Sequence, residues 1–271
     1  MEIINIDLKT GAEFREYPDS QLHINIGAVE KDTPYAVICS LTDTSKLYLL
    51  LAVSNALKHA GAKKVRLLIP YLMGARSDRI MEPGDSFDLE IIANLINECE
   101  FEDVSLLDVH SDVALLLIKN SRSTSNKKLV QSYDTKRDAV LICPDAGAAK
   151  KVGNYLQWNQ RLTDTVYVAK TRALDGSLTL RVLEPEKCID RHCVIIDDLC
   201  DGGGTFLGIA EQIKPKSLEL IVTHGIFSKG IGVFISAFDR ITTSNSYPQG
   251  YPNGTCSLVK VIDMLKTGEC K

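Results

Sequence analysis

Seven short apolar runs recur along the 271-residue chain, separated by longer stretches whose apolar residues follow a helical period. Most of these runs are continuous rather than alternating, which is typical of parallel strands that are covered on both faces. The predicted strands are Tyr35–Leu41, Val65–Pro70, Val104–Val109, Ala139–Cys143, Thr165–Ala169, Cys193–Asp197 and Leu218–Thr223. Because helical stretches lie between the runs, the pattern predicts an α/β protein built on parallel strands.

Four of the intervening stretches are predicted to be helices. The first, Ser45–Ala60, follows the N-cap residue Asp43 and ends at Gly61, as caps of these types favour. The second, Phe87–Cys99, follows Ser86 as its predicted N-cap. The other two predicted helices are Ala146–Leu156 and Phe206–Ile213. Strands that alternate with helices in this way predict a doubly wound parallel sheet.

The pattern of strand ends occurs twice, which predicts two similar halves. Strands end near Pro70 and Asp108 in the first half and near Pro144 and Asp197 in the second. Between the halves, residues 120–128 (NSRSTSNKK) are polar and lack periodicity, so we place the domain boundary there. The predicted domains are residues 1–124 and 125–271, and the final helix of the second domain can pack back on the first.

Composition and charge narrow the class of protein. The chain is 45% hydrophobic and 24% charged, as in ordinary soluble domains. No apolar run approaches the roughly 18 residues of a membrane span, and no basic, apolar leader opens the chain, so we expect neither a membrane anchor nor a signal peptide. The net charge of −4 argues against general attraction to nucleic acid. An anionic substrate must therefore be held by local groups or by a metal ion.

The eight cysteines are the next feature that bears on the class. They form no CxxC pair, and several lie inside apolar runs such as residues 140–143 (VLIC). A chain of this size and apolar content does not need disulfides. We therefore expect buried free thiols in a cytoplasmic protein.

The segment with the strongest chemical signal is residues 194–205 (VIIDDLCDGGGT). Glycines let backbone N–H groups curl round a phosphate, and a helix start favours an anion. Carboxylates accept hydrogen bonds from ribose hydroxyls or hold Mg²⁺. The alternative is a glycine-rich turn with solvated acids, but ligands bind at the carboxyl edge of such sheets. The residues predicted to bind ribose and phosphate are Asp197, Asp198, Asp201, Gly202, Gly203, Gly204 and Thr205.

This segment resembles the ribose-phosphate loop of the type I phosphoribosyltransferase fold. Five further segments resemble the phosphoribosyl-diphosphate synthetase family: residues 70–79 (PYLMGARSDR), 107–111 (LDVHS), 144–151 (PDAGAAKK), 170–172 (KTR) and 223–228 (THGIFS). They occur in the family's order, and the chain is similar to a short, divergent member. The resemblance implies two phosphoribosyltransferase-like halves with the active site between them, an ATP-side domain (1–124) and a ribose-phosphate-binding domain (125–271).

The resemblance also implies a reaction. The family transfers diphosphate from ATP to the C1 hydroxyl of ribose 5-phosphate, giving phosphoribosyl diphosphate and AMP. Arg76 and Asp78 are then ATP-binding residues, since arginine offers a planar donor fork to a triphosphate. His110 takes a catalytic and metal-binding role, although a lone histidine is more often structural. Asp145 holds Mg²⁺ or contacts the sugar; its alternative is a helix N-cap, and both roles are compatible.

Two cations begin the segment that resembles the family's mobile catalytic loop. Lys170 and Arg172 precede the polar residues 173–177 (ALDGS). Diphosphoryl transfer needs charge stabilisation more than a strong base, and cations arriving on a lid supply it and exclude water. The resemblance therefore implies catalytic roles for both residues. The alternative is an exposed basic hairpin, because charged loops are usually solvated.

A weaker resemblance lies near the N-terminus. Residues 17–21 (YPDSQ) are similar to the family segment that reads adenine across a subunit interface, with glutamine in place of glutamate. Asp19 and Gln21 are therefore predicted to bind ATP, since an amide both donates to and accepts from an adenine edge. The same resemblance predicts a homo-oligomer, a dimer or larger.

The chain departs from the family in its short length, in a recast loop at residues 80–86, and at Gly202, where the family usually has threonine. The glycine removes one donor to a terminal 5-phosphate, a loss of only about 1.5–3 kcal/mol, and it also removes bulk. Ribose 5-phosphate therefore remains one predicted substrate. A ribose with a larger 5-substituent, such as ADP-ribose converted to its 1-diphosphate for rebuilding NAD, is the other.

Two functions of other classes stay open at this stage. A catalytically silent regulatory homologue is disfavoured because His110, Lys170, Arg172 and the loop acids are all present. A true phosphoribosyltransferase is disfavoured by the ATP-type segment around Arg76 and by the duplicated architecture.

Overall fold

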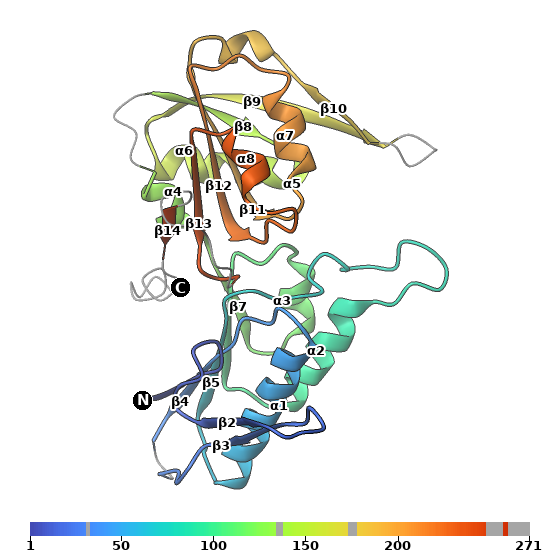
Figure 1. The fold of residues 1–271 in the computed structure, drawn as a ribbon, viewed down its shortest axis with the longest axis vertical. Helices are drawn as coiled ribbons and strands as arrows, with labels where there is room; N and C mark the ends of the chain where they lie inside the picture. The colour runs from blue at the N-terminus through green and yellow to red at the C-terminus, as the bar shows by residue number, and fades with distance from the viewer. Residues whose placement is uncertain (31–32, 134–137, 173–177, 248–256, 260–271) are drawn as a thin grey trace. The chain divides into compact units, whose positions relative to one another are not determined.

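The computed structural model describes the chain except for residues 31–32, 134–137, 173–177, 248–256 and 260–271. The described chain forms two compact units. One contains Met1–Thr124 together with Ser246 and Tyr247, and the other runs from Ser125 to Asn245 and includes strand β14 (Ser257–Val259). Each unit is built on its own sheet of mainly parallel strands (Figure 1). The predicted α/β class with parallel sheets is confirmed, whereas the predicted final helix lies outside the described residues.

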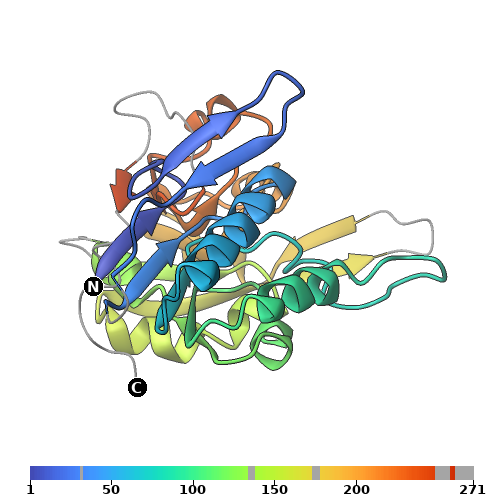
Figure 2. The same ribbon diagram turned by 90° about the horizontal axis from the view of Figure 1, so that it is seen from below.

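The first unit holds a five-stranded parallel sheet in the order β1-β4-β5-β6-β7 and a separate hairpin, β2-β3. Its strands are β1 (Glu2–Asn5), β2 (Glu13–Glu16), β3 (Leu22–Asn25), β4 (Tyr35–Ile38), β5 (Val65–Ile69), β6 (Asp103–Leu107) and β7 (Ser121–Thr124). Its helices are α1 (Thr44–His59), α2 (Asp88–Glu98) and α3 (Val113–Leu117). Helices α1 and α2 lie on the same face of the sheet (Figures 1 and 2). Burial alternates accordingly along β5, where Leu67 and Ile69 are buried and Arg66 is exposed.

The two long helices of this unit test the predicted caps. Asp43 caps α1 as expected, because its side chain accepts a hydrogen bond from the Lys46 amide at 3.0 Å, and Gly61 follows the helix in the left-handed conformation. The predicted cap of α2 is wrong. Phe87, not Ser86, is the N-cap residue, and the Ser86 hydroxyl donates to the Asp88 carboxylate rather than accepting from a helical amide.

The second unit holds a seven-stranded sheet in the order β10-β9-β8-β11-β12-β13-β14. All neighbours are parallel except β9 and β10, which are antiparallel. Its further strands are β8 (Ala139–Cys143), β9 (Leu162–Arg172), β10 (Leu178–Val182), β11 (His192–Cys200), β12 (Ser217–Gly225) and β13 (Arg240–Ser244). Its helices are α4 (Lys127–Gln131), α5 (Ala146–Ala149), α6 (Val152–Trp158), the 3₁₀ helix η1 (Pro185–Cys188), α7 (Gly204–Ala210) and α8 (Gly232–Ile235).

Helices cover this second sheet on both faces, with α7 and α8 on one side and α4 and α6 on the other (Figure 1). Val140 and Ile142 of β8 belong to the apolar cluster that includes Phe206 of α7 and Phe234 of α8. Leu141 lies between them in the strand and is buried as well. Side chains alternate across a strand, so burial of all three requires cover on both faces. This explains why β8 reads as a continuous apolar run.

Two predicted elements have wrong bounds, and a third stretch contains a strand that was not predicted. The predicted helix Ala146–Leu156 is two short helices, α5 and α6, separated at Lys150 and Lys151. The polar stretch 120–128 contains β7 as the edge strand of the first sheet, and the division between the two units falls inside this stretch, after Thr124. Strand β9 runs well past the predicted Thr165–Ala169, since its second half pairs with β10.

Candidate functional site

Three aspartates lie at the carboxyl ends of two neighbouring parallel strands of the second unit. Asp145 follows β8, and Asp197 and Asp198 lie in the second half of β11, the strand that pairs with β8. The structure thus brings together three residues that the sequence predicts for the sugar and metal site. Their arrangement is the one expected for a ligand site at the carboxyl edge of an α/β sheet.

The three carboxylates perturb one another. Burial, together with the neighbouring charges of Asp198 and Asp145, raises the pKa of Asp197 to about 8, while Lys151 opposes the shift. The Asp198 amide donates to Asp197 Oδ1 at 2.9 Å but does not offset these effects. A carboxylic acid that holds its proton near neutral pH here marks a buried site in which negative charge is also in excess. A divalent cation or hydroxyl donors would relieve that excess.

Lysines flank the aspartate cluster. Lys170, from β9, donates to Asp145 Oδ2 at 2.9 Å. Asp145 also caps α5 by accepting from the Ala148 amide at 2.9 Å, so the predicted N-cap role is confirmed. Burial works against the charged form of Asp145, yet the Ala148 amide and Lys170 together lower its pKa. Lys151 lies 3.9 Å from Asp198 Oδ2.

Lys151 is a functional candidate to which the sequence pattern assigns no role. It lies at the break between α5 and α6, and a continuous helix over residues 146–156 would orient it differently. The turn that follows Pro144 carries two adjacent lysines, and this pair was the sequence feature that could have indicated a functional lysine here. Only the three-dimensional structure distinguishes the lysine that contacts Asp198 from its neighbour.

The glycine loop follows β11. Gly203 has φ +76°, and a Cβ there would lie 2.1 Å from the Phe234 ring, so both backbone and packing require glycine. Gly202 is different: its φ is outside the left-handed region, and a Cβ would make ordinary contacts, the nearest at 3.4 Å to Lys229 Cε. Gly204 and Thr205 form the first turn of α7. Neither backbone nor packing therefore explains glycine at position 202.

The predicted lid belongs partly to a two-stranded ribbon. Lys170 pairs with Leu180, and Arg172 pairs with Leu178, in the antiparallel β9-β10 ladder. Figure 1 shows this ribbon at one edge of the second sheet. Residues 173–177 lie outside the described residues, as does the side chain of Arg172. Lys170 is thus placed beside the aspartates, and the catalytic role of Arg172 stays a prediction.

In the first unit, one carboxylate fixes the segment that carries Arg76. Asp78 Oδ2 accepts from Ser111 Oγ at 2.7 Å, and Oδ1 accepts from Arg79 at 2.7 Å. These bonds, with smaller contributions from the charges of Arg79 and His110, lower the pKa of Asp78 to about 2. Asp78 therefore ties the loop after β5 to the end of β6, where His110 lies. Its assignment to ATP stays a prediction, as does that of Arg76.

Asp19 and Gln21 lie in the turn between β2 and β3. Asp19 accepts from the Gln21 amide at 3.1 Å, and Tyr17 and Gln21 close the turn through a backbone bond of 2.9 Å. Gln21 lines an open groove of about 470 Å³. The groove is lined by Ser20, Gln21, Leu22, Thr44, Ser45 and Tyr48. These residues come from the turn, from the start of β3 and from α1, not from the loop that carries Arg76.

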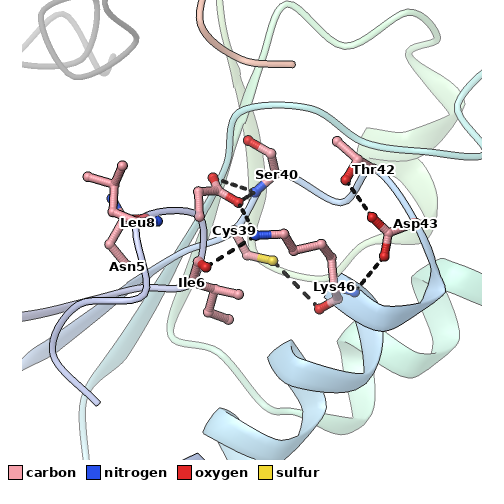
Figure 3. Close-up of polar contacts among 9 residues, drawn as sticks. Asn5, Ile6, Leu8, Cys39, Ser40, Thr42, Asp43 and Lys46 are labelled. Atoms are coloured by element: carbon pink, nitrogen blue, oxygen red, sulfur yellow. Dashed lines mark hydrogen bonds and ion pairs between the residues drawn. The ribbon is translucent and has the colours of Figure 1, made fainter. Parts of the chain in front are cut away.

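Figure 3 shows a polar cluster that the sequence analysis does not predict, at the carboxyl ends of β1 and β4. Lys46 Nζ donates to Asp7 Oδ1 at 3.1 Å and to the Ile6 carbonyl at 3.2 Å. Asp7 also accepts from the Ser40 amide at 2.9 and 3.1 Å. Because each charge has several partners, the cluster anchors α1 to the strand ends rather than offering a vacant binding site.

Among the residues that the structure describes, no group of three or more His, Cys, Asp or Glu side chains forms a ready-made metal site. Magnesium commonly binds through one or two carboxylates plus substrate phosphates, so the strand-end aspartates fit it. His110 belongs to the first unit and Asp145 to the second, and their shared metal site stays a prediction. The six described cysteines are free, while Cys256 and Cys270 lie outside the described residues. None of the described helices has the length and apolar character required to cross a membrane.

Comparisons with known proteins support the family resemblance that the sequence indicates. Residues 2–99 match the N-terminal domain of ribose phosphate pyrophosphokinase. The chain is 27% identical over 248 residues to a ribose-phosphate pyrophosphokinase of Mycoplasma genitalium, covering 85% of this chain and 72% of that protein. The similarity to the ribose-phosphate pyrophosphokinase family is confirmed. Ribose-phosphate pyrophosphokinase 3 of Saccharomyces cerevisiae is 26% identical, over 94% of this chain and 83% of its own length.

A solved structure confirms the predicted fold. The phosphoribosylpyrophosphate synthetase of Mycobacterium smegmatis superimposes with a TM-score of 0.79 and 19% identity, covering 94% of this chain and 87% of that one. Identity at this level supports the fold alone. The positions of the functional residues therefore rest on the geometry described above.

Proposed function

We propose that the protein is an ATP-dependent diphosphokinase that transfers diphosphate from ATP to the C1 hydroxyl of ribose 5-phosphate, giving phosphoribosyl diphosphate and AMP. The observation that supports this best is the cluster of Asp145, Asp197 and Asp198 with Lys170 bonded at its edge. The curated relatives named above are ribose-phosphate pyrophosphokinases, which favours ribose 5-phosphate over other sugars.

In this proposal, the residues of the second unit orient the sugar. Asp197 and Asp198 accept hydrogen bonds from the 2- and 3-hydroxyls, because ionised carboxylates are hydrogen-bond acceptors. A hydroxyl donor or a cation at the site would favour their ionised form near neutral pH. The loop formed by Asp201, Gly202, Gly203, Gly204 and Thr205 holds the 5-phosphate with backbone N–H groups. The C1 hydroxyl loses its proton to water as its oxygen attacks the β-phosphorus of ATP, the bond from that phosphorus to the bridging α-phosphate oxygen breaks, and AMP leaves with that oxygen.

Lys170 has the catalytic role in this scheme, and we include Arg172 with it. Charge develops on the transferred diphosphate and on the leaving AMP, and a preorganised cation stabilises it. In the described structure, Lys170 is held by Asp145 at 2.9 Å. A cation bound at Asp145 would compete with that bond and free Lys170 for phosphate. Arg76 and His110 serve the ATP side, and the hydrogen bond from Ser111 to Asp78 links the two segments that carry them.

Magnesium is the proposed cofactor. When bound, it neutralises phosphate charge and polarises the reacting diphosphate. Asp145 would hold the magnesium ion, and the sequence predicts His110 as a second ligand. The raised pKa of Asp197 is consistent with a cluster that gains from a nearby cation.

A second candidate substrate, ADP-ribose, is favoured by one observation. Glycine at position 202 is required by neither its backbone angle nor its packing. A small residue there leaves room for a larger 5-substituent on the sugar. In ADP-ribose this substituent is present, and the 1-diphosphate of ADP-ribose would serve to rebuild NAD. A silent regulatory homologue and a phosphoribosyltransferase remain the candidates of other classes.

The deciding experiment supplies purified protein, Mg²⁺ and ATP with either ribose 5-phosphate or ADP-ribose, and follows AMP. AMP release with ribose 5-phosphate supports the main proposal, and release only with ADP-ribose supports the second. No AMP with either sugar would reject the diphosphokinase and favour the regulatory homologue. A phosphoribosyltransferase would instead consume phosphoribosyl diphosphate and a base without ATP.

We also propose a homo-oligomer, a dimer or larger, in which Asp19 and Gln21 read adenine at a neighbouring subunit's site. Their position in an exposed hairpin turn is compatible with contact outside the chain. Light scattering combined with activity measurement tests this. A fully active monomer at working concentration would rule it out.

A further inference from the structure

The loop after β12, residues 226–230, is held against the end of β11. The amides of Ile226 and Phe227 both donate to the Cys200 carbonyl, at 2.8 and 3.1 Å. The Gly230 amide donates back to the Phe227 carbonyl at 2.7 Å, and the Phe227 side chain is buried. These bonds fix Ser228 and Lys229, which lie between the anchored residues, beside the glycine loop that follows Cys200.

Lys229 extends across Gly202. A Cβ built on Gly202 would lie 3.4 Å from Lys229 Cε, 3.7 Å from its Cδ and 3.7 Å from Ser228 Oγ. The ammonium group is one bond beyond Cε, so it lies within a few bond lengths of the loop backbone. Lys229 is exposed, and within the described part of the chain it forms no ion pair.

The other lysines at these strand ends are differently engaged. Lys170 is bonded to Asp145 and Lys151 lies near Asp198, so both serve the carboxylate cluster. Lys229 lies instead at the glycine end of the site, where no acidic partner competes for its ammonium within the described residues. A cation in such a position can bind an incoming anion without first breaking an existing pair.

We propose that Lys229 donates to the phosphate on C5 of the sugar and makes the site selective for a phosphomonoester. This inference rests on the proposed function, because it takes the glycine loop as the 5-phosphate site. A phosphomonoester carries nearly two negative charges at neutral pH, whereas each phosphate of a diphosphate diester carries one. Lys229 therefore favours ribose 5-phosphate over ADP-ribose, even though Gly202 leaves room for both.

Calorimetric binding of ribose 5-phosphate to the full-length protein, with Mg²⁺ present, tests this role. Lys229→Met keeps the alkyl chain over Gly202 and removes the charge. We expect its Kd for ribose 5-phosphate to rise about 5- to 30-fold, the range for a partly exposed charged hydrogen bond. The Kd for ADP-ribose should rise less. Lys229→Arg should restore most of the affinity.

Lys214→Met is the matched control, because Lys214 is also exposed but precedes the amino end of β12 rather than following its carboxyl end. It should bind both sugars as the wild type does. The effect of Lys229→Met should shrink at about 1 M salt, where the screening length is only about 3 Å. A purely structural role would not give this salt dependence.

The outcomes separate this inference from the proposed function. Unchanged ribose 5-phosphate affinity in Lys229→Met overturns the role of Lys229, whatever the AMP assay gives. An equal loss for both sugars overturns the selectivity. If the wild type binds ribose 5-phosphate but releases no AMP, the diphosphokinase proposal fails. The role of Lys229 in binding the sugar is then decided by the binding data alone. If the wild type binds no phosphorylated sugar, both fail.

Discussion

Removing the charge of Lys170 should separate catalysis from stability more clearly than any other single change. In Lys170→Met, the 2.9 Å bond to Asp145 is lost while the alkyl chain is kept. The side chains of Lys170 and Asp145 are 26% and 35% exposed, so solvent screens the pair. We therefore expect the free energy of unfolding to fall by less than about 1 kcal/mol.

The effect on turnover should be much larger. A preorganised donor to a charged transition state contributes about 10²- to 10³-fold in rate, which is roughly 2.7–4 kcal/mol. AMP release at saturating ATP and ribose 5-phosphate measures this, and urea unfolding measures stability in parallel. The loss of transition-state stabilisation should be several-fold larger than the loss in the free energy of unfolding. The reason is that only the transition state makes full use of the positive charge of Lys170.

Lys187→Met is the matched control for this experiment. Lys187 Nζ lies 2.9 Å from Glu184 Oε1 and its side chain is 35% exposed, so the variant loses a similar surface pair in the same unit. It should lose comparable stability and keep its turnover. A Lys170→Met enzyme that keeps more than about a tenth of wild-type turnover would refute the catalytic assignment.

Three further predictions follow from the site. Asp197→Asn should match the wild type in stability near pH 4 and exceed it by roughly 1–3 kcal/mol at pH 9, a figure discounted for partial exposure. The pKa of Asp197 is raised to about 8 in the folded protein, so the wild type loses stability as the pH rises from 4 to 9. Urea unfolding in the presence of a chelator would measure this loss. Gly202→Thr should fold normally and keep ribose 5-phosphate turnover while losing any ADP-ribose turnover, whereas Gly203→Ala should lower the melting temperature sharply; equal losses on both sugars in Gly202→Thr would remove the argument for a larger substrate. Ser111→Ala should raise the KM for ATP about tenfold with little change in fold, since it removes a hydrogen bond to a charged group; an unchanged KM would show that the loop needs no such support.

The sequence predicted the parallel sheets well because their strands carry a direct signal. A strand must be apolar wherever both of its faces are covered, as β8 is along its whole length, β11 is over residues 193–196 and β12 is over residues 220–222. Edge strands carry no such signal. Strand β7 is polar, and β10 is an edge strand that has β9 as its neighbour on one side. Neither strand was therefore predicted from the sequence.

Contacts between segments far apart in the chain were equally hard to predict. The pairing of Asp78 with Ser111 and of Asp7 with Lys46 spans more than thirty residues in each case. Strand ends and glycine loops are local features, so their chemistry is visible in the sequence. Which charge meets which depends on strand order and register, which single-sequence patterns do not contain.

The three consecutive glycines illustrate how far the sequence argument extends. In the sequence, Gly202, Gly203 and Gly204 look equivalent, and all three are interpreted as parts of a phosphate loop. The structure separates them, because Gly203 is required by a positive φ and by the Phe234 ring, whereas Gly202 faces the side chain of Lys229. A residue that the fold does not require is free to be set by the ligand. In the proposed scheme, the choice between ribose 5-phosphate and a larger sugar would depend on both Gly202 and Lys229. The glycine would set the space beyond C5, and the lysine would set the charge that is favoured there.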